Sequence, residues 1–285
     1  MVKRAAIVGL TIIVILAIVV VFSAIARVQF NRETEEKVED LFRGNNDRTP
    51  YIIQLSDLER LPGPVQKWLE GAGVVGQEEI KSARMLQEAE IRLNPGGRWM
   101  TLNAQQYIAA EPPGFIWQAR INAAPLIHIS GRDVYKDGRG NMLIKPLSII
   151  TIADETGFQI DQGTLVRYLA EMVWIPTVAV SNFVSWESID ENSARAIMRY
   201  GNIRVSGVFN FNEQGDPVSF SARRFGEFNG QFRMETWSVI MSDHREFDGF
   251  RIPSSGKITW ELEEGDFTWY KFKVKELEFN KPEVF

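Results

Sequence analysis

The chain has 285 residues, a formal net charge of −5, two histidines and no cysteine. The lack of cysteine excludes a disulfide framework, thiolate metal sites and an acylated cysteine anchor. The acidic balance argues against nucleic acid as a partner. A zinc site draws three or four ligands from His, Cys and carboxylates, so two isolated histidines argue against one. We therefore expect no metal and no cofactor.

The first feature along the chain is an uncharged run from Ala5 to Ala26, made mostly of Ala, Val, Ile, Leu and Phe. A transmembrane helix needs about 20 apolar residues, so this run is long enough to cross a bilayer. Lys3 and Arg4 precede it, which favours a cytoplasmic amino terminus. A secretory signal peptide is the alternative, although its apolar region typically has ~7–15 residues. We predict a single-pass anchor in the cell membrane, with the bilayer as the partner of residues 5–26.

Composition then divides the chain into three parts. Residues 1–30 are the anchor or signal peptide, and the charged residues 31–50 are expected to form a polar stalk. Residues 51–285 are expected to form a single extracytoplasmic domain, a size that is normal for a β-rich fold and sufficient for a large core. Near its start, proline in the first turn and a glycine at the end predict a short helix from about Pro64 to Glu70.

Beyond Glu78 the apolar residues recur at every second position, which is the pattern of strands with one buried face. Turn signals that tolerate positive φ separate these strands. From Ile203 onward the pattern predicts an antiparallel meander. The clearest alternations are Phe115-x-Trp117-x-Ala119-x-Ile121 and Tyr270-x-Phe272-x-Val274, and the clearest turns are Asp137-Gly138, Asn229-Gly230, Asp248-Gly249 and Gly265-Asp266.

One helical segment interrupts the strands. Asp161 can cap a helix from about Gln162 to Val173, whose apolar residues share one face, and Pro176 would end or kink it. An amphipathic helix among long strands must cover a sheet. The fold class that follows is a β-rich α+β fold: a strongly curved antiparallel sheet or partial barrel, with one or two covering helices.

Arg167 and Glu171 lie four residues apart, and therefore on one face of this helix. They are either an exposed ion pair or part of a cavity rim beside Trp174. In the second case Glu171 would be the best candidate for a general base, because apolar surroundings raise the pKa of a carboxyl group.

Asp133 lies by alternation on the same strand face as Tyr135, which points it inward. An inward carboxylate needs a partner, such as Arg167 or Arg223, unless it simply marks the end of the strand. The candidate ligand-binding rim comprises four charged and three aromatic residues: Asp133, Tyr135, Arg167, Glu171, Trp174, Arg223 and Trp237.

Three motifs carry a family resemblance. Leu61-Pro62-x-Pro64-Val65-Gln66-x-Trp68-Leu69, Gly131-Arg132-Asp133-Val134-Tyr135 and Arg167-Tyr168-Leu169-Ala170-Glu171-x-x-Trp174-x-Pro176 together resemble an uncharacterised bacterial family of membrane-anchored proteins. That family is a domain of unknown function, so the resemblance implies no activity. More distantly, the expected architecture is similar to lipoprotein-carrier half-barrels of the LolA/LolB type, whose concave face holds acyl chains.

Three functional hypotheses remain. The first is a membrane-tethered extracytoplasmic domain that binds a lipid or another apolar molecule between sheet and helix, without catalysis. The second is a structural or partner-binding envelope protein with a filled core. The third is a hydrolase-like enzyme that uses Glu171, Arg167 and Asp133. A cavity of several hundred Å³ would favour the first of these over the second.

Overall fold

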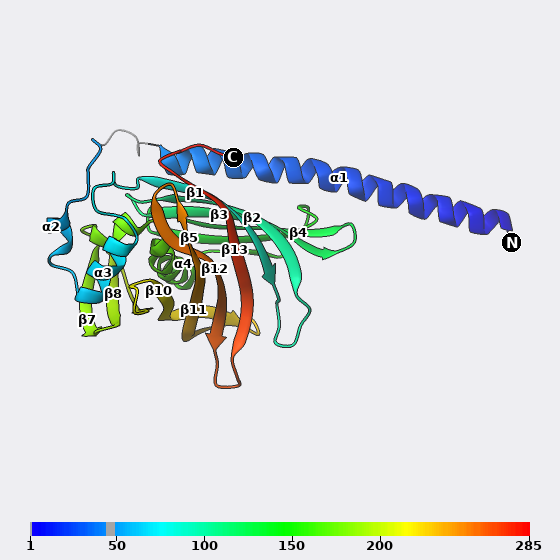
Figure 1. Ribbon diagram of the computed structural model, residues 1–285. Helices are drawn as coiled ribbons and strands as arrows, with labels where there is room; N and C mark the ends of the chain where they lie inside the picture. The colour runs from blue at the N-terminus through cyan, green and yellow to red at the C-terminus, as the bar shows by residue number, and fades with distance from the viewer. Residues whose placement is uncertain (1, 44–48) are drawn as a thin grey trace.

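The body of the protein is one curved antiparallel sheet, as Figure 1 shows for the computed structural model, which describes residues 2–43 and 49–285. Within these residues the sheet has 13 strands in the order β6-β5-β4-β3-β2-β1-β13-β12-β11-β10-β9-β8-β7. Sequential strands are neighbours, except that β1 pairs with β13, so β6 and β7 form the two edges. The predicted fold class, a curved antiparallel sheet with a few helices, is confirmed.

The strands differ in length from three to 17 residues, and the longest are in the C-terminal half. Their bounds are β1 (Ser82–Ile91), β2 (Met100–Ala109), β3 (Gly114–Ala124), β4 (Ile127–Lys136), β5 (Arg139–Pro146), β6 (Ala153–Glu155), β7 (Val184–Asp190), β8 (Ser193–Tyr200), β9 (Ile203–Phe211), β10 (Pro217–Phe228), β11 (Gln231–Phe247), β12 (Phe250–Glu261) and β13 (Phe267–Phe279).

The hairpins form where the sequence has residues that accept positive φ. Asn229 and Gly230 join β10 to β11, and Asp248 and Gly249 join β11 to β12, all with φ between 46° and 83°. Two consecutive residues with positive φ give the backbone twist that matches the twist of the flanking strands. The meander predicted from Ile203 onward is therefore present, as β9 to β13.

The helices before the sheet are α2 (Leu55–Leu58) and α3 (Gly63–Gly71), and α3 agrees with the helix predicted from Pro64 to Glu70. Trp68 of α3 stacks on Phe209 at a ring distance of 6.2 Å and lies 5.9 Å from the ring of Phe211. The segment before β1 therefore packs on the inner face of β9.

Helix α4 (Phe158–Glu171) begins four residues before the predicted start. Asp161 does not cap it, because Gly157 occupies the N-cap position. Instead Asp161 accepts hydrogen bonds from the backbone N–H of Gly140 at 2.7 Å and from Arg139 at 3.1 Å, which ties the first turn to β5. Two short 3₁₀ helices follow, η2 (Met172–Trp174) and η3 (Pro176–Val180).

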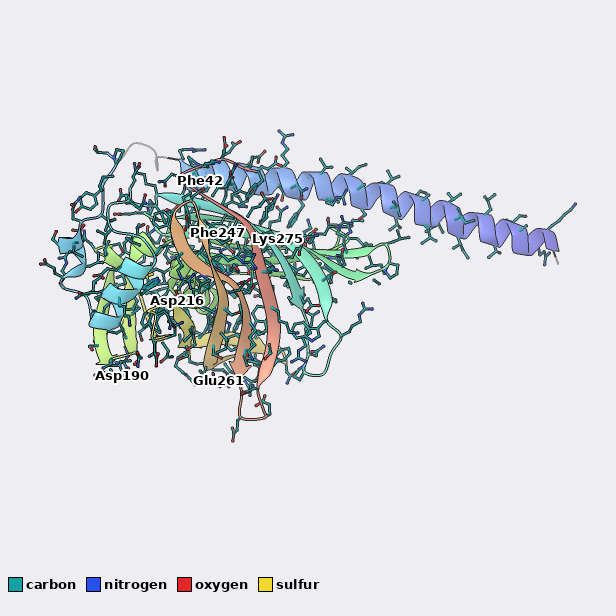
Figure 2. All side chains as sticks on the ribbon, in the orientation of Figure 1. Phe42, Asp190, Asp216, Phe247, Glu261 and Lys275 are labelled. Atoms are coloured by element: carbon teal, nitrogen blue, oxygen red, sulfur yellow. The ribbon has the colours of Figure 1, made fainter. Side chains whose placement is uncertain are left out.

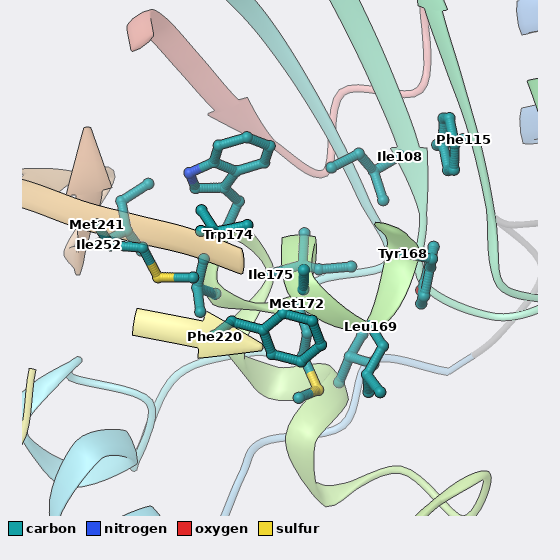
Figure 3. Packing of buried hydrophobic residues seen from close by; sticks show 14 of the residues in the cluster. Ile108, Phe115, Tyr168, Leu169, Met172, Trp174, Ile175, Phe220, Met241 and Ile252 are labelled. Carbon is teal, nitrogen blue, oxygen red and sulfur yellow. The ribbon is translucent and has the colours of Figure 1, made fainter. Parts of the chain in front are cut away.

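Helix α4 lies inside the curve of the sheet. It connects the two sheet edges, and it contacts β4 and β5 on one side and β9 and β10 on the other. Leu165, Val166 and Leu169 are fully buried, and even Gln162 and Thr164 are buried. Figure 3 shows Tyr168, Leu169 and Met172 among core side chains that come from several strands. The helix is thus the centre around which the sheet curls.

Helix α1 (Val2–Phe42) has two different halves. Its stretch from Ala6 is long and apolar enough to cross a membrane, a property that a signal sequence shares. Figures 1 and 2 show this half projecting away from the domain, while the end at Phe42 lies on the outer face of the sheet. The expected stalk is therefore helical up to Phe42 and packed on β2, β3 and β4; its residues 44–48 lie outside the described residues.

A stripe on the second half of α1 explains this packing. Phe30, Val38, Leu41 and Phe42 are buried, and the last three form an apolar cluster with Tyr107 and Ile116 on the outer face of the sheet. Polar contacts flank the stripe: Arg132 donates to Thr34 at 3.1 Å, Gln118 donates to Asn31 at 2.9 Å, and Lys136 pairs with Asp40.

This packing yields a prediction about where the stable domain begins. A fragment of residues 29–285 should resist urea better than a fragment of residues 51–285, because the shorter one exposes Tyr107 and Ile116. Burying one Val, Leu or Phe side chain is worth about 1.5–3 kcal/mol. Tryptophan fluorescence would follow unfolding of both fragments. Within residues 29–285, Val38→Ser should lower the midpoint and Glu36→Ser should not; equal midpoints for the two fragments would contradict the prediction.

Candidate functional site

The centre of the candidate site is an ion cluster between α4 and the inner face of the sheet. Arg167 of α4 donates to the Asp133 carboxylate of β4 at 2.6 Å and to the Glu171 carboxylate at 2.7 Å. Gln106 of β2 donates to the other oxygen of Glu171 at 2.6 Å. The Arg167 guanidinium also lies 4.6 Å from the centre of the Phe115 ring. One arginine thus holds two carboxylates within the curve of the sheet.

The cluster is mostly, but not completely, removed from water. The side chains of Arg167 and Glu171 are 15% and 11% exposed, whereas that of Asp133 is 26% exposed although it points into the curve. Asp133 is therefore the most exposed member of the cluster. Of the two predicted partners of this carboxylate, Arg167 is the actual one. The alternative of an exposed Arg167–Glu171 pair is wrong, because α4 is enclosed by the sheet.

Burial governs the protonation of these groups. Loss of water raises the pKa of Asp133 and of Glu171, and Arg167 only partly opposes this effect. Burial would lower the pKa of Arg167, but Glu171 and Asp133 together raise it, so the guanidinium stays charged. A carboxylate with both oxygens occupied, such as Glu171, is poorly placed to accept a proton from a substrate.

A second arginine, Arg224 of β10, lies close to this cluster. Its Nε donates to the carbonyl of Gly163 on α4 at 2.9 Å. Its guanidinium lies 4.9 Å from the ring centre of Trp237 and 5.6 Å from that of Trp260. Burial and then the charge of Arg167 lower its pKa to about 10. Arg224 is therefore cationic at neutral pH, and no described carboxylate forms an ion pair with it.

The indole of Trp237 adds an unsatisfied donor at the same place. Trp237 is 2% exposed, and its Nε1 has no hydrogen-bond partner among the described residues. A buried donor without a partner costs about 1–3 kcal/mol. Such groups in native proteins call for an acceptor that the protein itself does not supply, such as a water molecule or a ligand.

The other predicted rim residues lie elsewhere. Tyr135 is fully buried behind α4, with its ring 6.3 Å from that of Phe115. Trp174 packs edge-on against Phe272 and donates to the carbonyl of Pro253 at 3.0 Å. Arg223 is exposed and donates to the carbonyl of Met234. Of the predicted rim residues, Asp133, Arg167 and Glu171 thus form the ion cluster, and Trp237 lies beside Arg224.

The sequence carries a signal for Arg224 in the alternation of β10. Phe220, Ala222, Arg224 and Gly226 have the same parity in β10, and Phe220 is fully buried. Alternation therefore turns Arg224 inward and its neighbour Arg223 outward.

Two hollows lie outside this interior. One of about 490 Å³ is lined by residues of β7, β8 and β9, among them Arg195 and Arg204. The other, of about 430 Å³, is lined by Glu88, Lys271 and neighbours on β1, β2, β3 and β13. Both are open and contain mainly residues of the outer sheet face. Among the described residues no group of three His, Asp or Glu side chains could hold a metal ion.

Comparison with solved structures finds chains of similar shape at low identity. A LolA superfamily protein from Nitrosomonas europaea has 10% identity and a TM-score of 0.42, with 76% of this chain and 94% of that chain covered. A DUF1329 family protein from Desulfovibrio piger has 9% identity and the same TM-score, with 76% and 92% covered. No curated protein sequence matches the chain.

One family model matches the greater part of the sequence. The match runs over residues 51–272 and therefore includes α3, α4 and nearly the whole sheet. It also contains the three motifs on which the family resemblance was based. The chain belongs to the family of unknown function DUF6544.

Proposed function

We propose that this protein is a single-pass membrane protein whose extracytoplasmic domain binds an anionic amphiphile, such as a fatty acid or an acidic lipid, inside the curved sheet. Arg224 carries the proposal: it is a half-buried cation whose guanidinium lies over two tryptophan rings. Asp133 and Glu171 act on its charge from a distance, but both pair with Arg167, and no described carboxylate forms an ion pair with Arg224. A carboxylate or phosphate group would pair with its guanidinium and could accept from the Nε1 of Trp237 as well.

The neighbourhood suits the apolar part of such a ligand. Strands β1 to β4 contribute small or aliphatic side chains to the inner core, namely Ala89, Leu102, Ala104, Ala119, Ile121 and Ile129. Small residues on a concave sheet leave room that larger ones would fill. Ligand pockets of this kind are mostly apolar, with a few polar groups that fix the orientation of the ligand.

The test compares two adjacent arginines of β10. The full-length protein, Arg224→Gln and Arg223→Gln would be purified in the same detergent and titrated with the fluorescent fatty acid cis-parinaric acid. Energy transfer from the protein's tryptophans reports binding. A charge-assisted hydrogen bond is worth about 1.5–3 kcal/mol, so Arg224→Gln should weaken binding about tenfold or more, whereas Arg223→Gln should bind like the wild type.

Two further measurements test whether the anionic group and Arg224 are both required. The methyl ester of the probe lacks the anionic group and should bind weakly to all three proteins. Native mass spectrometry should find acidic lipid retained by the wild type and by Arg223→Gln, but not by Arg224→Gln. Equal probe affinity and equal lipid content in all three proteins, with unchanged circular dichroism, would reject the binding site and favour a structural protein with a filled core.

A further inference from the structure

Two neighbouring segments at one end of the sheet expose large aliphatic side chains. They are the β3–β4 turn and the loop that follows β5, and the backbone N–H of Leu147 joins them by donating to the carbonyl of His128 at 2.8 Å. Their exposed residues, 42% to 90% accessible, are here called the apolar tip: Leu126, Ile127, Ile149, Ile150 and Ile152.

Three other hairpins of the sheet end in polar residues and glycine. The β10–β11 turn has Asn229-Gly230, the β11–β12 turn has Asp248-Gly249, and the β12–β13 turn has Gly265-Asp266. At the β3–β4 turn, by contrast, Leu126 has a φ of 65°, a conformation that usually selects Gly, Asn or Asp. Leu126 is 90% exposed, so its side chain gains little from packing against the domain.

The apolar tip lies beside the helix that is long enough to cross a membrane. The hydroxyl of Ser23 in α1 donates to the carbonyl of Leu147 at 2.8 Å. Ser23 is three residues before the end of the apolar run at Ala26, which is about 4.5 Å along the axis of an α-helix. If the run spans the hydrocarbon core, Leu147 is therefore level with its boundary. Figure 1 shows the end of β4 beneath α1 on this side.

Hydrogen bonds around the apolar tip hold it beside Ser23 of α1. The hydroxyl of Ser148 contacts Nε2 of His128 at 3.0 Å and the hydroxyl of Ser130 at 2.8 Å, which fixes the loop to β4. The contact between Arg132 and Thr34 fixes β4 to α1 farther along the helix. Anchor and tip are thus parts of one packed unit, and no flexible spacer separates them.

The charges near the apolar tip are mainly positive, which suits a surface of anionic lipids. The segments 121–132 and 143–153 contain no acidic residue, while Lys145 lies within the second of them. Arg27 and Arg120 both act electrostatically on His128 of β4. Basic residues at this level attract anionic headgroups.

We propose that the apolar tip is a membrane-docking surface that enters the headgroup region of the bilayer crossed by α1. The domain then sits directly on the membrane, with α1 and the tip as two adjoining contacts. The proposal rests on α1 as a membrane span, which is part of the proposed function, but it is independent of ligand binding at Arg224.

The absence of cysteine in the natural chain makes the test direct. Leu126→Cys and Ile150→Cys in the full-length protein would be labelled with the environment-sensitive dye NBD in nanodiscs that contain phosphatidylglycerol. Both labels should emit at shorter wavelength and be quenched several-fold more by spin-labelled lipid than a label at Asp266→Cys on the β12–β13 turn. Aqueous iodide should quench the label at Asp266→Cys more strongly.

A label at Ile15→Cys, in the middle of the apolar run, separates the claim that α1 spans the bilayer from the claim that the apolar tip docks on it. If the lipid quencher reaches Ile15→Cys but not Leu126→Cys or Ile150→Cys, α1 spans the bilayer and the docking surface is wrong. A blue-shifted label at the tip that lipid does not quench would mean that protein covers it, which also overturns the proposal. These substitutions lie at exposed positions, and circular dichroism would verify that the fold is intact.

Discussion

Replacing Arg167 with methionine should lower the free energy of unfolding by about 3–5 kcal/mol, because it leaves the buried Glu171 and the half-buried Asp133 without their counter-ion. Asp133 and Glu171 both depend on this guanidinium, at 2.6 and 2.7 Å. Methionine is similar in length and apolar, so the loss of charge and not the loss of volume would dominate. All eight tryptophans lie beyond residue 50, so fluorescence during urea unfolding of the full-length protein reports on the domain and not on α1.

The matched control is an exposed arginine on the outer face. Arg195 pairs with Glu187 at 3.1 Å, but both side chains are about half exposed. Exposed pairs contribute roughly 0–1 kcal/mol, so Arg195→Met should change stability little. The triple variant with Arg167→Met, Asp133→Asn and Glu171→Gln removes all three charges and should recover part of the loss. Equal, small effects of Arg167→Met and Arg195→Met would show that water screens the inner cluster.

The strands and turns were predictable because their signals are local. Alternation of apolar residues decides which face of the sheet a side chain points to. Asn-Gly or Asp-Gly pairs decide where the chain turns. Both signals act within a few residues. The inward direction of Asp133 followed from the same rule. These signals gave the meander from β9 to β13 and the antiparallel character of the sheet.

The position of α4 could not be predicted in the same way, because it depends on how far the sheet curls. A helix that covers an open sheet buries one face, and the stripe of Leu165, Leu169 and Met172 fits that arrangement. In the structure β5 and β9 both reach α4, so Gln162 and Thr164 on its other faces are buried too. Their polar atoms are satisfied by backbone groups; Gln162, for example, donates to the carbonyl of Arg223.

The packing of the second half of α1 on the sheet was not predicted, because its charges outnumber its apolar residues. Phe30, Thr34, Val38 and Leu41 nevertheless recur at helical spacing, which is the pattern of a helix packed along one stripe. The charged residues between them face solvent or, as with Asp40, pair with the sheet. A polar stalk and a docked amphipathic helix therefore have similar compositions, and only the spacing of the apolar residues distinguishes them.

Leu169→Ala should destabilise the domain by about 3–5 kcal/mol, the upper part of the range for buried leucines. Leu169 is fully buried on α4, and the sheet surrounds the helix through β4, β5, β9 and β10. Neighbours that belong to one continuous sheet cannot easily close the space left by three lost carbon atoms, so most of the cavity should persist. Urea unfolding followed by tryptophan fluorescence would measure the change.

Leu93→Ala provides the control for this substitution, because Leu93 is 59% exposed in the β1–β2 turn and its truncation should cost no more than about 0.5 kcal/mol. The comparison also decides what α4 does. A helix that merely closes an opening would belong to the less stable part of the fold, and Leu169→Ala would then alter local exchange of its amide hydrogens with little effect on global unfolding. A loss of several kcal/mol with an unchanged urea dependence would instead identify α4 as the core around which the sheet is folded.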